Sequence, residues 1–431
     1  MSKDLSASEA ARILGVSLAT LYSYVSRGML TPSGALADRS KRYPHDEVLR
    51  LAARKADGKR GGHKVAAAMN WGTPVLETRI SGIADGRLHY RGHDVLALAD
   101  GATLEQVACL LWDDGGIDYF AAADANAADA AGTRAPRNAA AHASFAADAA
   151  AANSPYTADA AAVNSPFTAG VAAAIDSTRA MPPLEAAMCM LPVCAQSLSA
   201  SNDFIAGAAL MRMLAALLLK RAPSTQPLHL QVAQAWQADA AQTEWIRAAL
   251  VLLADHELNA SAFTVRCVAS TGAGQAATLS AGLAALSGPQ HGAGSTLIRA
   301  MLETALASHS IEAGIAAWFD GRDPSVVGFS HPLYPQGDPR GACLLERMSA
   351  WPQASAVLAI GERVATRLGM PANADFALAA MSVVCDWPPA AGEILFALAR
   401  SAGWIAHAAE QIANGSMIRP RARYVGTYQV T

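Results

Sequence analysis

Residues 328–340 read GFSHPLYPQGDPR, and this is the stretch of sequence that decides the fold of the chain. It contains His331 and an Asp-Pro-Arg triplet, Asp338-Pro339-Arg340. Taken alone, the triplet would be a turn with a surface charge, and the histidine would be an ordinary structural group. The role of the triplet and of the histidine therefore depends on which other polar stretches occur in the same chain.

Four other stretches also carry histidine, arginine or aspartate residues: ADHELN at 254–259, GPQHG at 288–292, NADF at 373–376, and the arginine-bearing segment 399–421. With the first stretch they bring together three histidines, three arginines and one aspartate. These seven residues are His256, His291, His331, Arg340, Arg400, Arg419 and Asp375.

Composition predicts a helix-rich globular protein. The chain has 431 residues, of which 52% are hydrophobic and 16% charged, with abundant Ala, which has the highest helix propensity. No apolar signal segment and no convincing membrane span is seen, so we expect a cytoplasmic protein without a membrane partner. The six cysteines lack CxxC spacing and are expected to be reduced thiols.

Charge separates a basic head from an acidic body. Residues 1–64 carry twelve Lys or Arg and six Asp or Glu, a balance of +6, whereas the rest carries 21 basic and 30 acidic residues, a balance of −9. We expect such a basic head to bind an anionic partner.

The head has the pattern of a helix-turn-helix. Ser6-Ala7-Ser8-Glu9 has the form of a capping box, Gly15-Val16 breaks the first helix, and Ser17 can cap a second one that ends at Gly28. Together with RSKRYPHDEVLRLAARK at 39–55, this resembles the winged helix-turn-helix of the MerR and excisionase type. The alternative is a helical appendage that packs on the body and binds nothing.

That resemblance implies DNA as a possible partner, with the second helix in the major groove. The residues that it would direct to DNA are Thr20, Tyr22, Ser23 and Arg27, with Arg39, Lys41 and Arg42 on the phosphates.

Three features describe the middle of the chain. Residues 58–70 form a linker, and Asp85-Gly86 predicts a β-hairpin before helical patterns take over. From about 115 to 183 the chain is rich in Ala with Asp, Asn, Ser and Thr, and it contains too few large apolar residues for a core of its own. We predict that this tract is a surface insertion.

The polar stretches, in this order, resemble the citrate synthase family. The resemblance covers 71–112 and 184–425 and includes VLETRISGIADGRLHYRGHDV, LLADHELNASAFTVRCVAST and ARSAGWIAHAAEQIANGSMIRPRARYVG. It implies an all-α citrate synthase fold preceded by the winged helix-turn-helix at 1–57. The large domain would span 71–287, the small domain 288–389, and 390–431 would return to the large domain.

The resemblance also assigns catalytic roles. Asp375 would be the base that removes a methyl proton from the acyl thioester, His291 would donate to the enolate oxygen, and His331 would polarise the keto group. The activity implied is condensation of acetyl-CoA with oxaloacetate and water to give citrate and CoA. No cofactor is expected, since CoA is part of a substrate and a product.

The carboxylates of oxaloacetate would be bound by arginines, whose planar forks suit carboxylates. Arg340, Arg400 and Arg419 match the family arginines, and Arg419 would come from the partner of a homodimer. His256 and Asn259 match further substrate contacts.

The segment after His291 departs from the family pattern. Citrate synthases commonly have Gly-Gly-Ala-Asn-Glu there, whereas this chain has Gly292-Ala293-Gly294-Ser295-Thr296. Proline follows His331 where many bacterial members have arginine, and Leu253 stands where many have histidine. These changes could alter CoA contacts or the choice of acyl chain.

The same motifs are compatible with other activities. A 2-methylcitrate synthase that uses propionyl-CoA differs by one methylene, which a pocket discriminates only modestly. A DNA-binding regulator whose body senses oxaloacetate or acyl-CoA is the alternative from another class. The histidines lack the ligand spacing of a zinc site, so no metal is expected. The sequence also has no nucleotide-binding loop, so nucleotide-dependent chemistry has no support.

Overall fold

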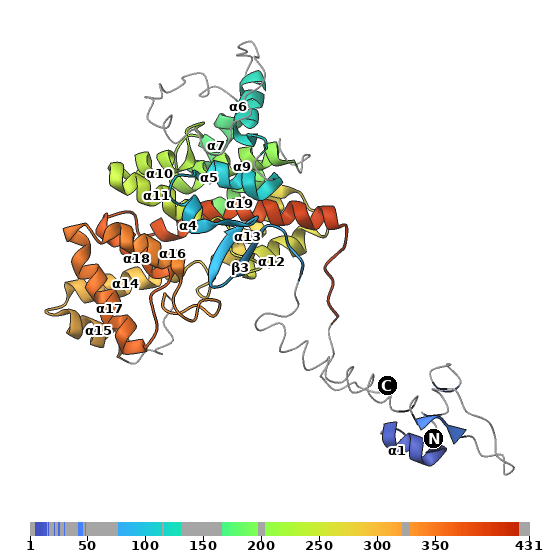
Figure 1. The fold of residues 1–431 in the computed structure, drawn as a ribbon. Coiled ribbons are helices and arrows are strands. Elements are labelled where there is room, and N and C mark those ends of the chain that lie inside the picture. Colours follow the sequence, from blue (N-terminus) through green and yellow to red (C-terminus); the bar gives the residue numbers. More distant parts are fainter. Residues whose placement is uncertain are drawn as a thin grey trace, which may run out of the picture. The chain divides into compact units, whose positions relative to one another are not determined.

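The computed structural model describes residues 5–14, 16, 21, 25, 30, 42–45, 48, 76–113, 116–130, 166–196, 203–320 and 328–421. The chain divides into two compact units, Met1–Glu77 and Thr78–Thr431 (Figure 1).

The first unit contains strand β1 (Leu5–Ser6), helix α1 (Ala7–Leu14) and strand β2 (Arg42–Tyr43). The predicted capping box is present, because the Ser6 backbone N–H donates to Glu9 Oε2 (2.8 Å) and the Glu9 N–H donates to Ser6 Oγ (3.4 Å). The two strands pair antiparallel, with Ser6 opposite Arg42. A small apolar core holds the unit together, formed by Ala10, Ala11, Leu14, Leu21, Leu30, Tyr43 and Val48.

Most of the residues predicted to contact DNA lie outside the described part of the chain: Thr20, Tyr22, Ser23, Arg27, Arg39 and Lys41. Arg42 is described and belongs to β2, where it is partly buried. Its phosphate contact stays a prediction.

The second unit is built almost entirely from helices, as the composition predicts. The described helices are α4 (Val95–Leu98), α5 (Leu104–Asp113), α6 (Tyr119–Ala130), α7 (Pro166–Ser177), α8 (Pro183–Cys194), α9 (Phe204–Leu219), α10 (Leu228–Trp236), α11 (Ala240–Leu252), α12 (Ala260–Ala269), α13 (Gln275–Leu286), α14 (Gly294–Ala307), α15 (Ile311–Phe319), α16 (Pro339–Met348), η4 (Pro352–Ala354), α17 (Ser355–Leu368), α18 (Ala374–Val384) and α19 (Ala391–Asn414). Among them, none is long and apolar enough to cross a membrane.

Helix α19 runs through the middle of this unit and contacts α5, α9, α11, α12, α13 and α18 (Figure 1). It has 24 residues, which makes it about 36 Å long. Two glycines allow close packing at its centre. A Cβ on Gly282 of α13 would lie 2.7 Å from the Trp404 ring, and one on Gly403 would lie 2.3 Å from Asp255 Oδ1. The absence of these side chains lets α13 and the loop before α12 approach α19.

The predicted hairpin is confirmed. Strands β3 (Ser81–Ala84) and β4 (Arg87–Tyr90) are joined by Asp85 and Gly86, which both have positive φ as a two-residue hairpin requires. A second turn leads into the short strand β5 (His93–Asp94). The hairpin matters for the site because Ser81 and Tyr90 contact the loop between α11 and α12.

Helices α14, α15, α17 and α18 pack on one another, and α16 packs on α18 (Figure 1). They fall within the range 288–389 that the sequence assigns to a small domain. The domain boundaries at 287 and 389 stay a prediction.

Both ends of the tract 115–183, which the sequence predicts to be a surface insertion, contain helices that pack on the rest of the second unit. Helix α6 contacts α9, the Phe120 ring stacks on Trp112 at 5.7 Å, and Asp124 forms an ion pair with Arg212 (2.8 Å). Helix α7 contributes the buried side chain of Val171 to the same core. Alanine-rich surfaces pack closely without large side chains, so these helices can pack although the tract has few large apolar residues. Residues 131–165, the centre of the tract, lie outside the described part.

Candidate active site

The first element of the site is the loop between α11 and α12. Asn259 caps α12, because its Oδ1 accepts from the backbone N–H groups of Ser261 (3.1 Å) and Ala262 (3.0 Å). His256 precedes this cap and is 5% exposed. Its Nε2 lies 2.9 Å from the hydroxyl oxygen of Tyr334.

A buried carboxylate holds this loop in place. Asp255 is fully buried and accepts a hydrogen bond from the Ser81 hydroxyl, and its Oδ1 lies 3.2 Å from Nε2 of His407. Burial alone would raise the pKa of Asp255, but the neighbouring His407 and Arg400 outweigh it and hold the pKa below its usual value. The Gly403 N–H also donates to the Ala254 carbonyl (3.1 Å), so α19 and the hairpin fix the loop from two sides.

The stretch 328–340 forms a turn over His256. The Tyr334 N–H donates to the His331 carbonyl (2.8 Å), and the Leu333 N–H donates to His331 Nδ1 (3.2 Å). A backbone N–H can only donate, so Nδ1 accepts and a neutral His331 carries its proton on Nε2. The rings of His256 and His331 meet edge to face at 4.9 Å.

Asp338 and Arg340 form a rigid corner at the start of α16. Asp338 caps the helix and accepts from Arg340 Nε (3.0 Å) and Nη2 (2.8 Å), so the pair is bidentate. Burial would raise the pKa of Asp338, but the Arg340 charge and hydrogen bonds hold it below its usual value. The N–H of Ala374 also donates to Asp338 Oδ2 (3.2 Å), which ties the start of α18 to this corner.

Asp375 is the second residue of α18, behind the Asn373 cap. Asn373 receives hydrogen bonds at its Oδ1 from Asp375 N–H (2.9 Å), and its own side chain donates to the Ser330 carbonyl (3.0 Å). This arrangement places Asp375 near Arg340, Asp338 and Arg400, whose charges act on its carboxyl. Asp375 Oδ1 is buried without a hydrogen-bond partner among the described residues, and burial raises the pKa of this carboxyl to about 7.

His291 lies in the turn before α14, with its Nε2 2.8 Å from the Ser261 hydroxyl oxygen. That hydroxyl has three neighbours, since it also accepts from Trp404 Nε1 (3.1 Å) and lies 2.7 Å from Asn259 Oδ1. Its single proton can go either to Asn259 or to His291, and the choice decides which nitrogen of His291 is protonated.

Arg400 lies on α19 with 1% exposure. Its Nε donates to the Leu253 carbonyl (2.9 Å), and its guanidinium lies 4.8 Å from the centre of the Phe396 ring. Among the described residues, no group hydrogen-bonds its terminal nitrogens. These nitrogens are therefore available to a carboxylate ligand.

Burial and the two arginines keep the histidines of the site neutral. The pKa of His331 and that of His291 are each lowered to about 4, first by burial and then by Arg340 or Arg400. The pKa of His256 falls well below its usual value for the same reasons. At neutral pH the site thus combines neutral imidazoles, two guanidinium groups and one carboxyl of raised pKa. Neutral histidines and arginines can supply hydrogen-bond donors to an anionic ligand.

The structure brings six of the eight predicted catalytic and substrate residues together: His256, His291, His331, Arg340, Asp375 and Arg400. Asn259 is adjacent, but its side chain is occupied as a helix cap and donates to the His256 carbonyl (3.3 Å). Arg419 is exposed in the segment after α19, next to Ile418, whose N–H donates to Ser270 Oγ (3.1 Å). Ser270 is the C-cap of α12, about 17 Å along the helix from the N-cap Asn259.

Sequence reasoning missed several residues that support the site: Ser81, Asp255, Ser261, Tyr334 and His407. All five lie inside the quoted motifs, but the motifs assign none of them a role. Their roles depend on contacts between segments far apart in the chain, which spacing alone does not reveal.

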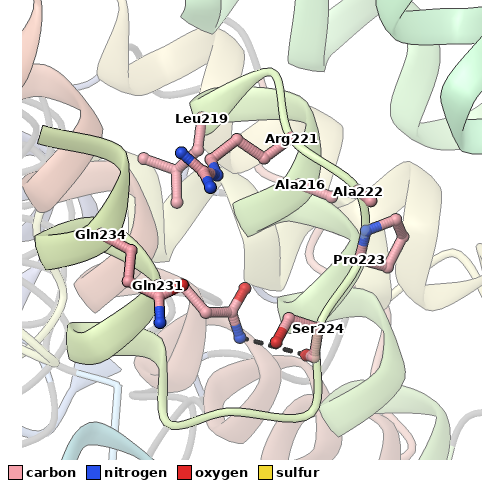
Figure 2. A pocket seen from close by; sticks show the side chains of 8 residues that line it. All are labelled: Ala216, Leu219, Arg221, Ala222, Pro223, Ser224, Gln231 and Gln234. Carbon is pink, nitrogen blue, oxygen red and sulfur yellow. Dashed lines mark hydrogen bonds between the residues drawn. The ribbon is translucent and has the colours of Figure 1, made fainter. Parts of the chain in front are cut away.

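A cavity of about 220 Å³ lies elsewhere, between the end of α9 and helix α10. Figure 2 shows Arg221, Ser224 and Gln231 among the side chains around it. None of the predicted site residues lines it. It is therefore separate from the histidine cluster.

Comparison with known proteins decides the family. The family described as citrate synthase, C-terminal domain, matches residues 68–421, which is more than half of the chain. The chain belongs to the citrate synthase family. A family described as helix-turn-helix domain matches residues 5–56, in agreement with the pattern of the head.

Two curated relatives illustrate the range of citrate synthase family members that the chain resembles. Citrate synthase 2 of Bacillus subtilis is 34% identical over 194 residues, which cover 43% of this chain and 51% of that protein. 2-Methylcitrate synthase 2 of Corynebacterium glutamicum is 32% identical over 190 residues, 42% of this chain and 49% of that protein. The chain thus matches about half the length of these relatives.

Solved citrate synthase structures share the fold. The ternary complex of carboxymethyl coenzyme A and oxaloacetate with citrate synthase from Thermoplasma acidophilum gives a TM-score of 0.63 at 21% identity and covers 83% of this chain and 96% of that one. Citrate synthase from Thermotoga maritima gives 0.59 at 20% identity, covering 84% and 96%. The predicted all-α citrate synthase fold is confirmed.

The segment that departs from the family pattern makes its own contacts. Thr296 donates a hydroxyl hydrogen bond to Glu393, which links the start of α14 to α19. The Ser295 hydroxyl is buried without a hydrogen-bond partner among the described residues, and a Cβ on Gly392 would lie 2.4 Å from it. Across the described ranges, no group of three His, Cys, Asp or Glu side chains could hold a metal ion.

Proposed function

We propose that this citrate synthase family member condenses acetyl-CoA with oxaloacetate and water to give citrate and CoA. The observation that carries the proposal is Asp375, a carboxyl with a pKa near 7 whose buried Oδ1 has no hydrogen-bond partner among the described residues. It lies in one cluster with the buried arginines and the neutral histidines. Carbon–carbon bond formation from a thioester needs such a base next to hydrogen-bond donors.

In the first step, the ionised Asp375 takes a proton from the methyl carbon of the acyl group. The negative charge that develops on the thioester oxygen needs a donor, and His291 supplies it. For this the Ser261 hydroxyl proton must point to His291 Nε2, so that the neutral ring keeps its proton on Nδ1.

In the second step, the new carbon nucleophile attacks the keto carbon of oxaloacetate. His331 carries its proton on Nε2, because Nδ1 accepts from the Leu333 N–H. That Nε2–H polarises the ketone and then protonates the alkoxide. Water finally cleaves the citryl thioester to citrate and the free thiol of CoA.

Oxaloacetate would be bound by the arginines. Arg400 has unoccupied terminal nitrogens within the described part of the chain, and Arg340 has Nη1 left after its bidentate contact with Asp338. Arg419 lies beside the C-terminal end of α12, whereas the histidine cluster lies at the start of that helix. This separation supports the donation of Arg419 to the other subunit of a homodimer. Asn259 would then act by fixing His256 rather than by a direct contact.

A steady-state assay of thiol release tests the proposal. We expect turnover with oxaloacetate plus acetyl-CoA, and propionyl-CoA measures the acyl preference in the same assay. Faster turnover with propionyl-CoA would make the protein a 2-methylcitrate synthase, the activity named for the Corynebacterium relative. No turnover with either thioester in a folded dimer would refute the enzymatic proposal.

A second function, DNA binding, is favoured by the helix-turn-helix match at 5–56 and by the +6 balance of residues 1–64. We propose that the head binds duplex DNA and that the body senses or converts its substrates. Gel retardation of the upstream DNA fragment at two salt concentrations tests it. Binding that weakens as salt rises is expected, whereas no binding at low salt would leave the head a structural appendage.

A further inference from the structure

Tyr334 lies at the centre of the candidate site, yet neither catalysis nor substrate binding as proposed above gives it a role. It is 2% exposed and packs against both His256 (5.5 Å between ring centres) and His331 (5.1 Å). The guanidinium of Arg340 lies over the same ring at 5.6 Å. The tyrosine therefore contacts one proposed catalytic group and two proposed substrate-binding groups.

The local backbone fixes this position. The turn from His331 to Tyr334 closes through the Tyr334 N–H and the His331 carbonyl, and the Gly337 N–H donates to the Tyr334 carbonyl (3.0 Å). Gly337 has a φ of +119°, which an L side chain rarely adopts. The ring is thus held between two tight turns and has little freedom to leave the site.

The Tyr334 hydroxyl has one hydrogen-bond partner among the described residues, Nε2 of His256 at 2.9 Å. A buried hydroxyl proton needs an acceptor, and here the acceptor that lies within reach is this nitrogen. Burial also raises the pKa of Tyr334 to about 12, so the phenol keeps its proton at neutral pH. The hydroxyl therefore donates, and the ring nitrogen accepts.

We propose that Tyr334 is a positioning residue that fixes the tautomer of His256: its hydroxyl donates to Nε2, so that the neutral imidazole carries its proton on Nδ1. Within the described part of the chain no group hydrogen-bonds that Nδ1, which leaves its N–H to the keto acid. The inference rests on the proposed function for the identity of this ligand.

The chemistry of a dicarboxylate explains why the tautomer matters. A carboxylate or keto oxygen only accepts hydrogen bonds, so a binding site should present donors. His331 meets this need through Leu333, which forces its proton onto Nε2. Tyr334 does the same for His256 through the opposite nitrogen. With the other tautomer, a lone pair on Nδ1 would face the oxygens of the ligand and repel them.

Substitution Tyr334→Phe removes only the hydroxyl and tests the proposal by kinetics. We expect KM for oxaloacetate to rise about tenfold while kcat changes less than about twofold. The reason is that His256 no longer keeps its proton on Nδ1, so the substrate loses this N–H as a well-placed donor. In a His256→Asn background the same substitution should add nothing to KM, since the residue through which Tyr334 acts is gone. Unchanged KM in the single variant, or full additivity in the double variant, overturns the proposal.

Tyr119→Phe is the matched control. It removes a hydroxyl that donates to Asp113 in another part of the unit, and it should leave both kinetic constants unchanged. Thermal melting of all variants checks that they fold. A tenfold KM increase in the control would show that loss of any partly buried tyrosine hydroxyl has this effect, and would overturn the specific role of Tyr334.

Nuclear magnetic resonance of ¹⁵N-histidine-labelled wild-type protein reads the tautomer without any turnover. The His256 signals are assigned by their loss in His256→Asn. We expect Nε2 unprotonated and Nδ1 protonated in the wild type, with Nε2–H gaining population in Tyr334→Phe. Protonated Nε2 in the wild type overturns the proposal even if the enzyme is active. Conversely, a wild type with the expected tautomer and no thiol release would refute the proposed function alone.

Discussion

Asp375 shows how a single residue is prepared for chemistry by its surroundings. Its backbone is fixed by the Asn373 cap, and its carboxyl is buried near Arg340 and Arg400. Burial dominates over the two positive charges and raises the pKa to about 7. A carboxylate in this range is a stronger base than an exposed aspartate and is still partly ionised at neutral pH.

Replacing this base is the most direct test at the residue scale. Asp375→Asn keeps the shape of the side chain but cannot accept the methyl proton. We expect kcat to fall by about 10²- to 10⁴-fold, the usual contribution of a general base. Oxaloacetate binding, measured by calorimetry, should persist because the arginines are untouched. Turnover within about twofold of the wild type would remove Asp375 from the mechanism.

The pH dependence follows from the same carboxyl. Only the ionised Asp375 can act as a base, and its folded-state pKa is about 7. We therefore expect kcat/KM for the acyl-CoA to rise from pH 5.5 to pH 8 with a midpoint near 7. The histidines do not titrate in this window, since the pKa values of His291 and His331 lie near 4. A profile that is flat between pH 5.5 and pH 8 would contradict the assignment.

At the scale of elements, the site depends on how closely α19 approaches the loop before α12. Gly403 makes that contact possible, and its N–H donates to the Ala254 carbonyl. Asp255 then links the loop to His407 of α19 and to Ser81 of the hairpin. The position of His256 is therefore set by three elements that are distant in sequence.

Gly403→Ala tests this packing. The added Cβ would lie 2.3 Å from Asp255 Oδ1 and 2.6 Å from the Ala254 carbonyl, so the loop must move. We expect a loss of about 1–3 kcal/mol in the free energy of unfolding, measured in urea, together with a higher KM for oxaloacetate.

Gly170→Ala is the control for this substitution. Gly170 lies in α7 with open space around it, so the change should be neutral or slightly stabilising, as alanine favours helix. Equal effects of the two substitutions would mean that close contact at Gly403 is not what positions the loop.

Local signals in the sequence predicted much at this scale, and long-range contacts limited the rest. The capping box at Ser6 and the turn at Asp85-Gly86 are local and are confirmed. The insertion at 115–183 stays a prediction, and the contacts of α6 and α7 with α9 are not visible in the composition of these helices. The Tyr334–His256 hydrogen bond likewise joins residues 78 positions apart, which no spacing rule predicts.

At the scale of the whole molecule, the incomplete set of arginines in the cluster of one chain supports the proposed homodimer. Arg340 and Arg400 lie with the histidines, whereas Arg419 follows α19 and is exposed near the end of α12. A homodimer is symmetric, so each subunit can give its Arg419 to the other and receive one in return. Each of the two sites would then contain residues of both chains.

A complementation experiment tests this arrangement. Asp375→Asn and Arg419→Ala homodimers should each be inactive or nearly so. After mixed refolding, half of the dimers carry one chain of each variant. In these, one site has both defects, and the other has an intact Asp375 with an intact Arg419 from its partner. Activity should therefore recover to about a quarter of the wild-type level, by the statistics of random pairing.

Arg419 acting within its own chain predicts a different result. Each site of the mixed dimer would then keep one defect, and no activity would return. Mixing Asp375→Asn with Arg400→Ala is the matched control, because Arg400 lies in the same cluster as Asp375 and both defects must stay in their own sites. Recovery in the Arg419 mixture but not in the Arg400 mixture is the outcome that requires a site shared between two chains.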